Sequence, residues 1–262
     1  MNYQVKVNYK LDNEELRQIL ANLTSKYILS KEKVSFYYEE IKTHNTYSFN
    51  EDILFYAASS IKILVCVMLL EMASQNQIDL QEKLLVAMDD LKQDTGIIKY
   101  QKEDTEYTIQ ELIRLAIVES DNTAYIKLVN YVGKDNLEQY GKSLGATHTM
   151  EGKDLFGLIN AKDMAIYWKK IYEFLNTNPY GPIFKEYLSN PSFKIITDET
   201  LDHHSFIRKY GSWDIAYHEA GIVETDNPFY LIILTQKNKC DDKEEFVNMT
   251  AKTLMKINKM SK

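Results

Sequence analysis

The chain has 262 residues, which is enough for one large domain or two closely packed ones. Its composition, 45% hydrophobic and 26% charged, is that of an ordinary globular protein. The net charge of −7 argues against a general nucleic-acid-binding surface, because such surfaces are basic. With only Cys66 and Cys240, we expect neither a disulfide framework nor a cysteine metal cluster.

The first residues, Met1-Asn2-Tyr3-Gln4-Val5, lack the apolar core of a signal peptide. We therefore expect either a cytoplasmic protein or one whose leader was removed before this numbering begins. No stretch reaches the roughly 20 apolar residues that cross a bilayer, so no transmembrane segment is predicted. The chain shows no internal repeat or low-complexity tract, and we expect a monomer.

Hydrophobic periodicity and capping residues predict the elements in chain order. A first helix begins near Asp12 or Asn13, and a hairpin turning at His44-Asn45 follows it. The region from about 75 to 200 is predicted to be mostly helical, with a loop over 146–160, and the last quarter changes to the two-residue period of strands. The expected helices are 12–27, 61–72, 108–117, 123–132, 161–175 and 242–257, and the expected strands are 33–41, 46–49, 205–212, 215–224 and 229–236.

This order predicts an α+β fold in which a five-stranded antiparallel sheet is flanked by the terminal helices. Residues 1–58 and 201–262 would form the sheet domain. Residues 59–200 would form an all-helical lobe, inserted in sequence between the two parts of the sheet.

The most apolar stretch runs from Ile61 to Met72, where only Lys62 and Glu71 are not apolar. Because no polar stripe interrupts it, a helix here should be buried on all sides. An unpaired buried ammonium costs several kcal/mol, so Lys62 must be paired, deprotonated or placed at a cleft. Ser59 lies one helical turn earlier, at the positive end of the helix dipole. A hydroxyl beside an amine at such a helix end suits acyl transfer.

Two plainer interpretations of this stretch remain open. Ser59 or Ser60 could serve only as a helix N-cap, and Lys62 could extend to the surface. The spacing also recurs from Ser30 to Lys33, although that copy is polar and precedes a strand pattern instead of a buried helix.

Two further motifs follow in order. Ser120-Asp121-Asn122 falls between two predicted helices, and Lys209-Tyr210-Gly211 ends a predicted strand. Together with the Ser-x-x-Lys at Ser59, they form the motif set of class A β-lactamases and penicillin-binding proteins. The chain therefore resembles the serine β-lactamase and penicillin-binding-protein superfamily, most closely the class A β-lactamases, over nearly its whole length. The resemblance implies an active site between the sheet domain and the helical lobe, with no metal and no cofactor.

The resemblance also implies a role for each motif residue. It assigns Ser59 as the nucleophile, Lys62 as its base, and Ser120 as the hydroxyl that relays a proton to the leaving nitrogen. Asn122 would bind the substrate amide, and Lys209 would hold both the relay hydroxyl and the substrate carboxylate. The backbone N–H groups of Ser59 and Ser212 would form the oxyanion hole. From the residues themselves, two neighbouring lysines with one buried should lower an amine pKa. Gly211 should let a substrate backbone approach the strand end.

Three departures from the class A pattern matter. Tyr210 replaces a small hydroxyl residue, which affects carboxylate recognition, although Ser212 could substitute in part. The loop over 146–160 has no Glu-x-x-x-Asn, so only Glu151 and Asp154 are candidates for the base that activates water for deacylation. The arginine that many class A enzymes place on the next strand is absent, and His218 is the nearest basic residue.

The sequence therefore supports three functions. The first is a class A-like serine β-lactamase that hydrolyses β-lactam amide bonds through an acyl-enzyme on Ser59. The alternative is a penicillin-binding DD-peptidase or related acyl-transfer enzyme, which acts on cell-wall peptides and deacylates slowly. The third is a non-catalytic binding module with the same fold. The expected partner is a small β-lactam or a peptidoglycan peptide, and not a nucleic acid.

Overall fold

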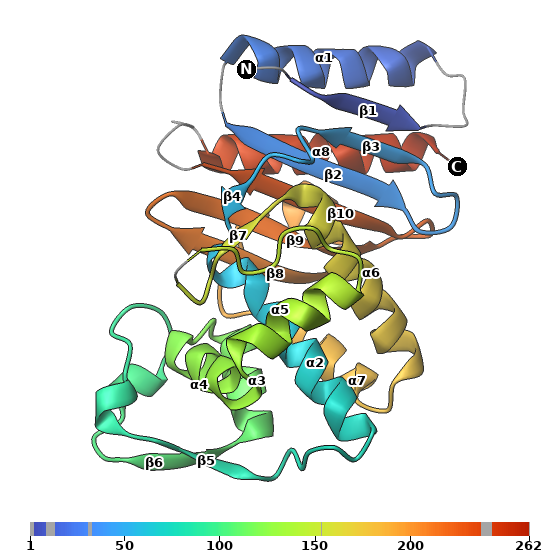
Figure 1. Ribbon diagram of the computed structural model, residues 1–262. Helices are drawn as coiled ribbons and strands as arrows, with labels where there is room; N and C mark the ends of the chain where they lie inside the picture. The colour runs from blue at the N-terminus through green and yellow to red at the C-terminus, as the bar shows by residue number, and fades with distance from the viewer. Residues whose placement is uncertain (1–2, 9–13, 31–32, 153, 237–242, 262) are drawn as a thin grey trace.

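The computed structural model describes residues 3–8, 14–30, 33–152, 154–236 and 243–261. Within these residues the main sheet has six antiparallel strands in the order β1-β3-β2-β10-β9-β8 (Figure 1). The strands are β1 Val5–Asn8, β2 Val34–Glu40, β3 Thr46–Phe49, β8 Ser205–Trp213, β9 Ala216–Glu224 and β10 Phe229–Thr235.

The sheet has one strand more than the five that were predicted. The additional strand is β1, which pairs with β3 so that Val5 lies opposite Phe49. All four residues of β1 are exposed, so the strand has no alternation of buried and exposed side chains that a sequence pattern could reveal. Pairing of its backbone with the edge of the sheet places it there.

The expected helices are present, and the central lobe also contains short strands. The prediction of an all-helical lobe was therefore wrong, because β5 (Lys83–Val86) pairs with β6 (Thr105–Thr108), and β7 (Leu158–Ile159) pairs with β4 (Phe55–Tyr56). Pairs this short depend on backbone contacts and show little side-chain period. The helices are α1 Glu14–Ser30, α2 Lys62–Ser74, α3 Ile109–Val118, α4 Asn122–Val132, α5 Lys134–Ser143, α6 Ala161–Thr177, α7 Gly181–Ser189 and α8 Lys243–Met260, with short 3-10 turns η1 Ala58–Ile61, η2 Met88–Asp90, η3 Ile98–Tyr100 and η4 Glu199–Leu201.

Two hydrophobic cores lie on opposite faces of the sheet. Along β9, Ala220 and Ile222 face the core of the helical lobe, whereas Tyr217 and Val223 face the core beneath α8. This two-residue alternation allows one strand to contribute to both cores.

The apolar helix α2 lies at the centre of the helical lobe, and its predicted burial is confirmed. Lys62 at its first position is 0% exposed, so a titratable amine lies inside the protein where the lobe meets the sheet. None of the helices in the described ranges combines the length and apolar content needed to cross a membrane.

Candidate active site

Ser59 lies in the 3-10 turn η1, which leads directly into α2. The preceding residue, Ala58, has a φ of +47°, a left-handed backbone that costs a non-glycine residue about 1–3 kcal/mol. Strained residues of this kind concentrate at functional sites, where the surrounding structure holds them in place. The turn therefore presents Ser59 at the N-terminal end of the buried helix, as predicted.

A small cleft of about 90 Å³ opens beside Ser59. It brings together one residue from each motif region, namely Ser59, Asn122 and Ser212, although they lie far apart in the sequence. The complete lining is Tyr56, Ala58, Ser59, Asp94, Thr95, Asn122, Phe156, Ser212 and Trp213. The structure thus places the predicted nucleophile, the predicted amide ligand and the predicted oxyanion-hole residue on one surface.

The amine of Lys62 is held by the Ser-Asp-Asn motif. It donates to the carbonyl oxygen of Ser120 at 2.5 Å and to Oδ1 of Asn122 at 2.6 Å, and it lies 3.4 Å from the Ser120 hydroxyl. Ser59 is not among its hydrogen-bond partners within the described part of the chain. Lys62 is therefore neither unpaired nor extended to the surface.

The hydroxyl of Ser120 lies between two buried amines. Lys209 donates to its oxygen at 2.9 Å from one side, and Lys62 approaches from the other. Burial and the charge of Lys209 lower the pKa of Lys62 well below its usual range. Burial lowers the pKa of Lys209 to about 7, although Glu219 opposes the shift. A neutral amine is thus accessible at physiological pH, which agrees with the expectation from the two lysines.

Asp121, the middle residue of the motif, positions its neighbours. Its Oδ1 caps α4 by accepting from the N–H of Ala124 at 2.9 Å, and its Oδ2 accepts from Ile97 N (2.7 Å) and Ile98 N (2.8 Å). Asp121 therefore acts as a helix cap, while the residues on either side of it contact Lys62. Asp121 also fixes the neighbouring segment 94–98, which supplies part of the cleft wall.

Gly211 is required by packing between β8 and η1. A Cβ at this position would lie 2.8 Å from both Ala57 O and Ser60 N, which is closer than Cβ atoms approach other atoms. The sequence-based explanation was close approach of a substrate, whereas the structure shows close approach of the turn that carries Ser59. Gly211 thereby sets the distance between the strand lysine Lys209 and the turn that carries Ser59.

His218 has a structural environment. Its side chain is fully buried, with Nδ1 accepting from Thr235 N at 3.0 Å and Nε2 within 2.8 Å of Tyr56 O. Burial lowers the pKa of His218 to about 4, so the ring is neutral at physiological pH. It ties β9 to the strand before η1 and does not replace the missing arginine at the cleft.

A larger hollow of about 530 Å³ lies between α1 and α8, and none of the motif residues lines it. In the ranges that the structure describes, no group of three His, Cys, Asp or Glu side chains gathers as metal ligands would. The chemistry suggested by the sequence therefore belongs to the smaller cleft. Cys66 is a free, buried cysteine on α2, and Cys240 falls outside the described ranges.

The sequence matches the model of the beta-lactamase enzyme family over residues 15–257. The chain belongs to this family. No curated protein sequence matches it.

Three solved structures have a similar fold. PBP-A is 19% identical with a TM-score of 0.85, and the match covers 97% of this chain and 100% of PBP-A. The TLA-3 extended-spectrum beta-lactamase is 17% identical with a TM-score of 0.81 (94% of this chain and 100% of that one), and a beta-lactamase from Sphaerobacter thermophilus DSM 20745 is 17% identical with a TM-score of 0.80 (92% and 95%). At these identities the likeness establishes the fold. The predicted resemblance to β-lactamase-like serine hydrolases is confirmed, as is the β-lactamase/transpeptidase-like fold.

Of the two acids on the 146–160 loop of this β-lactamase-family chain, neither lines the cleft. Glu151 is 48% exposed and pairs with His148 at 2.8 Å. Asp154 accepts from two N–H groups of its own loop, and its charge adds to the effect of burial in raising the pKa of Tyr56 to about 12. Asp154 therefore lies nearer the cleft than Glu151, the other candidate for the deacylation base.

Several residues of the cleft were not found from the sequence. Tyr56, Phe156 and Trp213 make its wall aromatic, and Asp94 and Thr95 complete it. The turn around Gly96, whose φ is +115°, is the signal that could have indicated the last two. The second Ser-x-x-Lys begins at the end of α1, and its two middle residues fall outside the described ranges.

Proposed function

We propose that this chain is a class A-like serine enzyme that β-lactams acylate at Ser59. The observation that carries the proposal is the convergence of two buried amines on Ser120 beside the Ser59 turn. A serine hydroxyl needs a base to become a nucleophile, and the lowered pKa of Lys62 makes it the available base. Membership of the beta-lactamase family supports a hydrolase of this superfamily.

In this proposal acylation takes three proton transfers. Neutral Lys62 accepts the proton of Ser59 while Oγ attacks the carbonyl carbon of the β-lactam. The C–N bond then breaks, and the leaving nitrogen takes the proton of the Ser120 hydroxyl. Ser120 regains a proton from the Lys62 ammonium, which lies 3.4 Å away, so Lys62 returns to the neutral form.

The remaining site residues would hold the substrate. The Oδ1 of Asn122 accepts from Lys62, which leaves its amide N–H₂ available to donate to the substrate carbonyl. Backbone N–H groups of Ser59 and Ser212 are proposed to stabilise the oxyanion, and both residues line the cleft. Removal of one such donor typically costs about 10²–10³ in rate.

A second candidate, a penicillin-binding acyl-transfer enzyme, is favoured by the position of the loop acids. A deacylation base must reach a water molecule within hydrogen-bond distance, and neither Glu151 nor Asp154 lines the cleft. A variant of PBP-A, a protein of similar fold, has a structure described as an acyl-enzyme complex with penicillin-G. We therefore propose slow deacylation, with a long-lived adduct on Ser59.

The test is incubation with a fluorescent penicillin, followed by intact mass over time. A single adduct is expected on the wild type and none on Ser59→Ala. The neighbouring Ser60→Ala is the matched control and should keep the adduct, since the hydroxyl of Ser60 only donates to Ala57 O at 2.6 Å. Equal labelling of wild type and Ser59→Ala would overturn the assignment. No labelling of any variant would favour the binding module.

Adduct lifetime then separates the two enzymes. Lifetimes of minutes that are unchanged in Glu151→Gln and Asp154→Asn are expected for the penicillin-binding function. Rapid turnover abolished by either change would restore a complete class A mechanism. Asp94→Asn belongs in the same series, because Asp94 is a carboxylate that does line the cleft.

A further inference from the structure

Tyr210 covers the amine that the motif comparison assigns to the substrate carboxylate. The Nζ of Lys209 lies 4.1 Å from the centroid of the Tyr210 ring, within the range of a cation–π contact. Lys209 is 1% exposed, Tyr210 is 7% exposed, and neither is among the residues that line the cleft. Burial raises the pKa of the Tyr210 phenol, and a hydrogen bond with Ser120 opposes that rise, so the phenol also reaches the relay hydroxyl.

Two hydrogen bonds and an aromatic ring already surround the amine of Lys209. An ammonium has three N–H donors. Lys209 uses one on the hydroxyl of Ser120 at 2.9 Å and one on the carbonyl oxygen of Tyr210 at 3.1 Å, and the Tyr210 ring lies over the amine. A substrate carboxylate could bind Lys209 only by displacing this ring.

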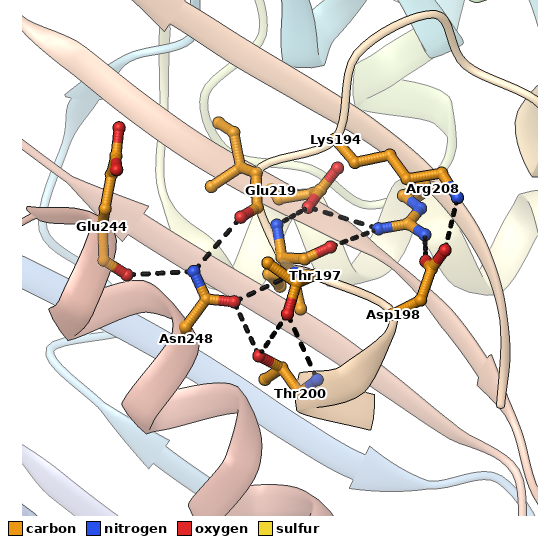
Figure 2. A network of polar contacts seen from close by, with 10 residues as sticks. Lys194, Thr197, Asp198, Thr200, Arg208, Glu219, Glu244 and Asn248 are labelled. Atoms are coloured by element: carbon orange, nitrogen blue, oxygen red, sulfur yellow. Dashed lines mark hydrogen bonds and ion pairs between the residues drawn. The ribbon is translucent and has the colours of Figure 1, made fainter. Parts of the chain in front are cut away.

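The ring is braced from outside by Phe193, which packs edge-on against it with centroids 5.0 Å apart. Phe193 precedes the segment 194–201, which side chains of β8, β9 and α8 hold in place (Figure 2). Displacement of Tyr210 would therefore disturb an anchored segment. The anchoring contacts are Arg208 Nη1 to Ile196 O (2.7 Å), Arg208 Nη2 to Asp198 Oδ1 (2.6 Å), Ile196 N to Glu219 Oε2 (2.6 Å), Thr197 N to Asn248 Oδ1 (3.0 Å) and Asn248 Nδ2 to Ile195 O (3.2 Å).

The charge of the cleft also disfavours a substrate carboxylate. Among the described residues that line it, Asp94 is the charged one, and it is an acid. The rest of the lining is polar without charge, aromatic or, at Ala58, apolar. An anionic group would therefore meet a carboxylate and aromatic rings, and no exposed cation.

We propose that Tyr210 closes the anion-binding position at Lys209, so that this site selects acyl donors with a neutral group where a β-lactam carries its carboxylate. The inference rests on the proposed acylation of Ser59 and specifies its substrate class. Lys209 then acts on the relay hydroxyl of Ser120 and not on the substrate.

The test compares benzylpenicillin with its methyl ester, which removes that charge and adds one methyl group. Second-order rate constants for acylation are measured for the wild type, Tyr210→Thr and Tyr210→Phe. The wild type should react with the ester at least as fast as with the acid. Tyr210→Thr exposes Lys209, so the acid-to-ester ratio should rise about tenfold or more, as expected for a hydrogen bond between charged groups. Tyr210→Phe keeps the ring and should keep the wild-type ratio.

A wild type that prefers the acid by tenfold, or a ratio that Tyr210→Thr leaves unchanged, would overturn the inference. If no variant is acylated, the proposed acylation of Ser59 is contradicted, but closure by Tyr210 is not. A second measurement then tests that closure. Equilibrium binding of phenylacetate and phenylacetamide is then compared in Ser59→Ala with and without Tyr210→Thr. Preferential binding of phenylacetate only in the double variant supports closure by Tyr210, and equal preferences refute it.

Discussion

Glu219 allows a quantitative test of how the sheet beneath the site is held together. Its side chain is 0% exposed and lies on β9 opposite Tyr210. One oxygen accepts from Ile196 N at 2.6 Å and lies 3.8 Å from Arg208, while Oε1 has no hydrogen-bond partner among the described residues. Burial raises the pKa of Glu219 to about 7, although Arg208 opposes the shift.

The raised pKa of Glu219 makes the free energy of unfolding depend on pH. The folded protein holds the Glu219 proton more tightly than the unfolded chain, whose pKa is near the ordinary value of 4.5. The contribution to stability is therefore complete below about pH 4.5 and is lost as the pH rises through about 7. A pKa difference of about 2.5 units at about 1.4 kcal/mol per unit amounts to roughly 3 kcal/mol.

The assay is urea unfolding of the wild type and Glu219→Gln between pH 4.5 and 8. Glutamine has the same shape and cannot ionise, so the variant does not lose this stability as the pH rises. The difference in unfolding free energy between variant and wild type should shift by roughly 3 kcal/mol in favour of the variant as the pH rises. Glu199→Gln, an exposed change in the anchored segment, should follow the wild-type pH dependence. A difference for Glu219→Gln that stays constant with pH, or shifts the other way, would refute the reasoning.

Three further changes test the site itself. Lys62→Ala should slow acylation by about 10²–10⁴-fold and lower the unfolding free energy by no more than about 1–3 kcal/mol; stopped-flow labelling at the wild-type rate would show that Lys62 is structural. Gly211→Ala places a Cβ 2.8 Å from Ala57 O and Ser60 N, so thermal unfolding should show a loss of about 1–3 kcal/mol together with slower acylation. Unchanged melting and rate would contradict that packing argument. Glu151→Gln should leave the adduct lifetime within about twofold, and a large increase, measured by timed mass spectrometry, would identify it as the deacylation base.

The sequence by itself determined the parts of this protein that depend on local pattern. The apolar run after Lys62 predicted a buried helix. A buried amine at its start had to be paired, deprotonated or placed at a cleft. Ser59, Ser120 and Lys209 were recognised because their motifs occur in a fixed order at predicted element ends. The strands of the last quarter were visible because both faces of the sheet are covered and their residues are strongly β-forming.

The tertiary structure alone decided which side chains meet. Hydrophobic period reports burial, but it carries no information on strand register or on how closely two elements pack. It could not show that Gly211 accommodates the turn that carries Ser59, that an exposed strand extends the sheet, or that Glu151 pairs with His148. Nor could it place the Tyr210 ring over Lys209, because that contact depends on the anchored segment behind Phe193 and on contacts between residues far apart in the chain.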